Sequence, residues 1–92
     1  MNTYLDTVLN GELQELSAAK AGRNNTLFKV AARLYQFCEA GAWTHDEMTD
    51  MLAGAASATG LGRDEIRTTL KSAMRKAAGH PAELPTQERG AR

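Results

Sequence analysis

Four basic residues recur at every fourth position late in the sequence: Arg63, Arg67, Lys71 and Arg75. On a helix they form one stripe that drifts slowly around the axis, because four residues slightly exceed one turn. Such a stripe is typical of a helix that contacts DNA phosphates, and binding of this kind weakens steeply with salt. The alternative is a solvated face, or one neutralised by the acidic residues of the preceding helix.

A second candidate phosphate contact lies at Arg23 and Asn24, where a helical pattern begins. Free backbone N–H groups and the helix dipole favour an anion at a helix start. Lys29 and Arg33 would extend this basic surface along the same helix. The alternative is structural: Asn24 or Asn25 caps the helix, because asparagine is a preferred N-cap residue, and Arg23 pairs with an acidic residue of the first helix.

The other reactive side chains do not combine into a catalytic or metal site. Asp46 and Asp50 lie one turn apart without a third ligand, whereas hard cations take about six oxygens. His45 and His80 have no cysteine, histidine or acid partner at ligand spacing. Cys38 falls on an apolar stripe, so we expect a buried core residue and not a nucleophile. We therefore expect no enzymatic activity, no metal and no cofactor.

Helices must position these residues. Of the 92 residues, 42% are hydrophobic but only 5% are aromatic, and alanine is abundant where β-branched valine is rare. This composition favours helices over strands. Apolar residues at helical spacing predict a first helix from about Thr3 to Ala21, stopped by Gly22. The second is expected from Asn24 or Asn25 to near Ala40.

The third and fourth helices begin with clear local signals. Thr44 and Glu47 form a capping box, in which each side chain satisfies a backbone N–H of the other residue. The third helix then ends at Gly60. The fourth is expected to begin at Gly62 as its cap and to close at Gly79.

Short connections between these segments favour antiparallel neighbours. The sequence therefore predicts an all-α fold, a compact bundle of four helices formed by residues 1–79 as a single domain. Residues 80–92 contain both prolines and no apolar periodicity, which predicts a disordered tail. The chain has no signal-like N-terminus and no apolar run near the roughly 20 residues of a membrane span. We expect a cytoplasmic protein that does not enter a membrane.

The stretch GRNNTLFKVAARL, from Gly22 to Leu34, resembles the helical C-terminal domain of primases. That module follows the catalytic domain in phage and plasmid bifunctional DNA primase-polymerases. A second stretch, GLGRDEIRTTLKS from Gly60 to Ser72, is similar to the family's turn into its last helix. The resemblance covers about residues 3–78 and leaves out the catalytic domain with its acidic metal ligands. It implies an accessory role in DNA replication, in the bacterial host cytoplasm if the chain is phage-encoded, and not primer synthesis.

The leading hypothesis is therefore an accessory domain that binds single- or double-stranded DNA, or docks on a replication protein such as a helicase or polymerase. The predicted nucleic-acid contacts are Arg23, Asn24, Lys29, Arg33, Arg63, Arg67, Lys71 and Arg75. The alternative is a protein-interaction module, a monomer or weak homodimer, that does not contact DNA; acidic and basic segments alternate along a chain of zero net charge. A third hypothesis is a small transcriptional regulator with a helix-turn-helix. The DNA-binding hypothesis requires the two basic segments to meet on one outward surface.

Overall fold

The computed structural model describes residues 3–84, and in this range it contains four α-helices. They are α1 (Thr3–Ala18), α2 (Arg23–Glu39), α3 (His45–Ala58) and α4 (Arg63–Ala77). The predicted all-α bundle of four helices is confirmed. The main difference in bounds is at the end of α1, which stops at Ala18 and not at Ala21.

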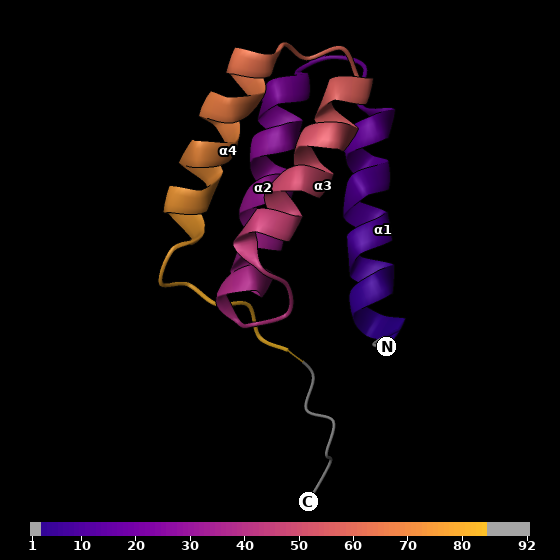
Figure 1. The fold of residues 1–92 in the computed structure, drawn as a ribbon. Coiled ribbons are helices and arrows are strands. Elements are labelled where there is room, and N and C mark those ends of the chain that lie inside the picture. The colour runs from indigo at the N-terminus through magenta and orange to yellow at the C-terminus, as the bar shows by residue number, and fades with distance from the viewer. Residues whose placement is uncertain (1–2, 85–92) are drawn as a thin grey trace, which may run out of the picture.

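Helix α2 lies at the centre of the bundle and packs against the other three helices. Helix α4 makes its most extensive contact with α2 and a lighter one with α3, and α1 packs on α2 and α3. Helices α1 and α4 do not touch each other, and they lie on opposite sides of the molecule (Figure 1).

The core reflects this arrangement. Helix α1 contributes Leu16 as its one buried residue, although several of its leucines are half-buried against the core. Among residues 3–84 the buried side chains are all apolar or aromatic apart from the thiol of Cys38, and no charged side chain is buried. The buried residues of α2 are Leu27, Val30, Ala31, Leu34, Tyr35 and Cys38.

The capping box at α3 is confirmed. The backbone N–H of Glu47 donates to Oγ1 of Thr44 at 3.1 Å, and the backbone N–H of Thr44 donates to the Glu47 carboxylate at 3.3 Å. Gly62 is the N-cap of α4, as predicted.

The predicted asparagine cap of α2 is wrong. The N-cap is Gly22, with φ 62° and no side-chain hydrogen bond, so Asn24 and Asn25 lie inside the first turn. The physical reason is the left-handed backbone at Gly22, a conformation that glycine adopts without the steric penalty of a Cβ. This turn starts the helix one residue before Asn24.

Residues 80–84, which the sequence analysis assigned to the disordered tail, contain no helix but lie against the last turn of α2. The backbone N–H of Ala82 donates to the carbonyl of Gln36 at 2.8 Å. The backbone N–H of Gly79 donates to Oε1 of Glu39 at 3.0 Å. The rest of the predicted tail, residues 85–92, lies outside the described residues. Within the described range, no helix has the length and hydropathy needed to cross a membrane.

Candidate docking groove between α3 and α4

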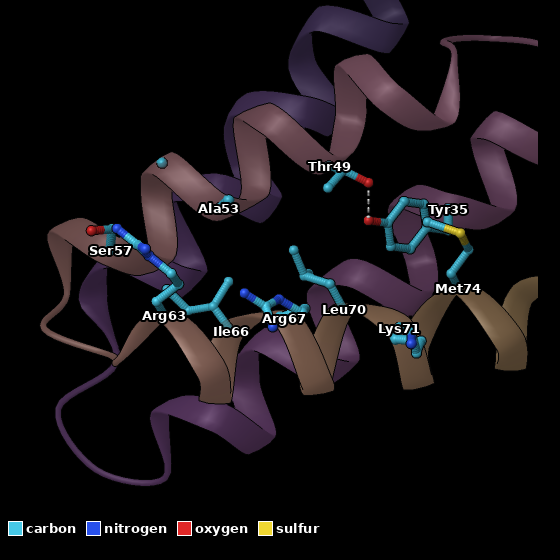
Figure 2. Close-up of a pocket in the computed structure, with 11 residues that line it drawn as sticks. Tyr35, Thr49, Ala53, Ser57, Arg63, Ile66, Arg67, Leu70, Lys71 and Met74 are labelled. Atoms are coloured by element: carbon cyan, nitrogen blue, oxygen red, sulfur yellow. Dashed lines mark hydrogen bonds between the residues drawn. The ribbon is translucent and has the colours of Figure 1, made fainter.

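A groove runs between α3 and α4, with α2 beneath it (Figure 2). Its volume is about 730 Å³, which falls within the usual range for ligand sites. The groove exists because the α3 wall consists of small side chains, which leave space opposite the longer ones of α4. The lining residues are Tyr35 of α2, Thr49, Ala53, Gly54 and Ser57 of α3, and Arg63, Ile66, Arg67, Leu70, Lys71 and Met74 of α4.

Tyr35 forms a fixed part of the groove floor. Its side chain is fully buried, and its hydroxyl shares a hydrogen bond of 2.6 Å with Oγ1 of Thr49, which ties α2 to α3 (Figure 2). The ring also stacks on His45, with the two ring planes 14° apart. Burial raises the pKa of Tyr35, so its hydroxyl stays neutral and acts only as a hydrogen-bonding group.

One rim of the groove is basic. Arg63, Arg67 and Lys71 are exposed along α4, and Arg63 extends toward Ser57 of α3, whereas Arg67 runs back along α4 (Figure 2). Among residues 3–84 their only ion pair joins Arg67 to Asp64 at 3.9 Å, with both side chains mostly in solvent. Such a pair contributes little, because water screens it. The alternative in which the acidic residues of α3 neutralise this stripe is therefore not what the structure shows.

Arg75, the fourth residue of the predicted stripe, does not line the groove. It is exposed in the last turn of α4, where a cation interacts favourably with the helix dipole. The stripe thus turns away from α3 along its length, as the four-residue spacing requires.

The second basic segment does not join this surface. Arg33 faces α1, where its Nη2 lies 2.7 Å from Glu12 and 3.1 Å from Glu15, and its Nε lies 3.0 Å from Glu12. The hydrogen bond to Glu12 is the main cause that raises the pKa of Arg33. Since α1 does not touch α4, the expectation that Arg33 and the α4 stripe form one outward surface is wrong.

The remaining predicted contacts of α2 also lie outside the groove. Nε of Arg23 donates to the carbonyl of Ala19 at 3.4 Å, and its guanidinium approaches Gly60 in the α3–α4 turn. This contact, and not the predicted pairing with an acid, is what the structure shows for Arg23. Asn24 and Lys29 are exposed and do not line the groove.

Glu39 and His45 form a pair that sequence spacing did not predict. Nε2 of His45 lies 2.8 Å from Oε2 of Glu39, so the expectation that His45 has no acid partner is wrong. The N–H of Gly79 and then the ring of His45 lower the pKa of Glu39. This carboxylate therefore connects the end of α2 to the start of α3 and to the residue that follows α4.

The remaining candidate groups are the thiol of Cys38 and the possible metal ligands. Cys38 is buried, and burial raises its pKa to about 11, with Sγ donating to the carbonyl of Thr44 at 3.7 Å. In the part of the chain that the structure describes, no group of three or more His, Cys, Asp or Glu residues is arranged to hold a metal ion.

The sequence contained one signal of the groove that its interpretation missed. Gly54 lies within α3 among small residues, and glycine inside a helix costs about 1 kcal/mol relative to alanine. A Cβ built at Gly54 would meet nothing within 4 Å. The position is thus open to an incoming molecule and not filled by this chain.

No protein-family model, curated protein or solved structure matches the chain.

Proposed function

We propose that this chain is a non-catalytic accessory domain that docks on another protein through the α3–α4 groove. The observation that carries the proposal is the groove itself, which has apolar walls and a basic rim with no strong ion pair of its own. Recognition grooves combine these features: apolar area supplies affinity, and a few charged groups at the edge supply orientation and specificity. The resemblance to the primase helical domain makes a replication protein, such as a helicase or polymerase, the expected partner.

Docking on a protein accounts for this site better than binding to DNA. Phosphates would pair with Arg67 and Lys71 but would leave the space between α3 and α4 unfilled, where half-buried Ala53 and Met74 line the groove. Arg33 is paired with two carboxylates of α1, so it would have to exchange these partners to bind a phosphate. DNA remains the second candidate because Arg63, Arg67, Lys71 and Arg75 are exposed along a single helix.

Two titrations under the same buffer conditions test the proposal. The purified chain is titrated with the helicase, primase and polymerase encoded in the same genome, and separately with single- and double-stranded oligonucleotides. We expect saturable binding to one of the proteins, and only weak binding to DNA that disappears near 0.15 M salt. Tight binding to oligonucleotides together with no binding to any replication protein would contradict docking and favour the DNA-binding alternative.

A further inference from the structure

The occupant of the groove can be described more closely from its shape and charge. Both walls are helices, and the lining residues of α4 extend from Arg63 to Met74, which corresponds to roughly 16 Å along the helix axis. The backbone groups of both walls are used within their helices, so no strand edge is available for an extended peptide. A groove between two helices instead accommodates a third helix, whose apolar residues at three- and four-residue spacing enter it.

The α3 wall allows such a helix to approach closely. Its lining residues are Thr49, Ala53, Gly54 and Ser57, and the position of a Cβ at Gly54 is empty. Helix axes usually pack 8–10 Å apart, depending on the side chains at the contact, and small residues permit the shorter distances. On the opposite wall Ile66 and Leu70 are almost fully buried, so the incoming helix would cover mainly half-buried Met74 and the aliphatic stems of the Arg67 and Lys71 side chains.

The charge of the rim defines the other face of the occupant. Arg63, Arg67 and Lys71 are each separated by four residues, or about 6 Å along α4. Acidic residues at the same four-residue spacing on a helix lying beside α4 would match all three bases. Pairs of this kind, at the edge of an apolar contact, mainly set specificity and the rate of association.

We infer that the α3–α4 groove binds an acidic amphipathic helix of the partner protein. This inference rests on the docking function proposed above, and it adds the chemical class of the partner. The helix presents leucine-like residues to Ala53, Met74 and the other apolar atoms that line the groove, and carboxylates to the basic rim.

The probe is a synthetic helical peptide of about 15 residues, long enough for helix to form on binding. It carries leucines at three- and four-residue spacing, flanked on one side by glutamates. Two comparison peptides have lysine in place of every glutamate, or the same composition in scrambled order. Fluorescence anisotropy at about 0.15 M salt is expected to show binding of the acidic peptide, and about tenfold or more weaker binding of the other two.

A matched pair of glycine substitutions locates the binding site. Gly54→Leu places a side chain in the open groove, and Gly11→Leu does the same on α1, where a Cβ also meets nothing within 4 Å. Both changes improve helix propensity, so both variants should remain folded, which circular dichroism verifies. We expect Gly54→Leu to weaken binding of the acidic peptide at least about tenfold, and Gly11→Leu to leave it unchanged.

A matched pair of charge reversals tests the rim. Arg67→Glu with Lys71→Glu changes two groove residues, whereas Arg75→Glu with Lys29→Glu makes the same change in net charge at residues that do not line it. The first variant should bind the acidic peptide much more weakly and the lysine peptide more tightly than the unmodified chain does. The second should behave like the unmodified chain, apart from a small general effect of charge.

Several results would overturn the inference. Equal binding of the acidic and lysine peptides would show that the partner helix need not be acidic. Unchanged binding of the acidic peptide by Gly54→Leu would show that the groove is not the binding site. Displacement of the peptide by an oligonucleotide assigns the rim to nucleic acid, and a dimer that forms without peptide and is lost in Gly54→Leu assigns the groove to a second copy. Gly54→Leu could abolish binding of a whole replication protein while the peptides show no charge preference. In that case the proposed docking function stands, and only the inference that the partner helix is acidic is wrong.

Discussion

Cys38 illustrates how position alone changes the chemistry of a reactive side chain. Its pKa of about 11 results mainly from burial, with the carboxylates of Glu39 and Glu47 adding to the shift. The thiolate is the reactive form, so a folded chain near neutral pH should be almost inert toward alkylating reagents.

We therefore expect iodoacetamide to label Cys38 about a hundredfold more slowly in the folded chain than in urea at pH 8, since each pKa unit changes the thiolate fraction tenfold. Mass spectrometry of timed samples measures both rates. Equal rates in the two states would show that the thiol is exposed in the native fold.

Glu39 predicts a dependence of stability on pH. Its pKa in the folded state is lowered, first by the N–H of Gly79 and then by His45, whereas the unfolded value lies near 4.5. A lowered pKa stabilises the fold above the unfolded value, and this contribution is lost as pH falls through the folded value. Glu39→Gln should therefore reduce the loss of thermal stability between about pH 5 and pH 3. Circular dichroism melts at each pH measure this loss, and Glu83→Gln is a matched control.

At the scale of the helices, the capping box offers a direct test. Thr44→Ala removes the acceptor for the N–H of Glu47 and should lower the free energy of unfolding by about 1 kcal/mol. Thr68→Ala, at an exposed position inside α4, is the matched control and should change stability by less than about 0.5 kcal/mol. Urea unfolding curves for the two variants give the comparison. Similar effects in both would mean that the cap does not stabilise α3.

Alanine in place of glycine should have opposite effects at two positions. Gly54→Ala adds helix propensity in open space and should stabilise the chain by up to about 1 kcal/mol. Gly22→Ala forces a Cβ into a left-handed conformation at φ 62° and should destabilise by about 1–2 kcal/mol. Thermal melts distinguish the signs, and the same sign at both positions would contradict this account of α2 and α3.

The helices show which parts of the structure a sequence can predict. The start of α3 was predictable because the capping box is a contact between residues three positions apart. The start of α2 was not, because it depends on the backbone conformation of Gly22 and not on the asparagines that follow. The stripe of Arg63, Arg67 and Lys71 was predictable for the same local reason, since a fixed spacing on one helix sets a common face.

The groove could not be predicted in this way. It depends on which small residues of α3 lie opposite which long residues of α4, and this is a property of packing between helices. The pairing of Arg33 with Glu12 and Glu15 joins residues far apart in sequence and was missed for the same reason.

For the whole molecule, the burial pattern predicts unequal local stability. Helix α2 is at the centre of the core, whereas α1 contributes Leu16 alone to the fully buried set. Segments with few buried apolar contacts open more readily than the core. We expect the backbone amides of α1 to exchange with solvent deuterium faster than those of α2, by about tenfold or more, as measured by mass spectrometry of peptic fragments. Equal protection of the two helices would indicate that the bundle opens only as one unit.

The described chain begins and ends at the same end of the bundle: α1 starts there, and residues 80–84 lie against the last turn of α2 (Figure 1). The α3–α4 turn lies at the far end. A fluorophore or sensor surface attached at Thr3 or Leu84 would therefore sit away from Arg63 and leave that mouth of the groove facing the solution. The same geometry suits insertion of residues 3–84 into a loop of a host protein, since both connections arise at one end of the bundle.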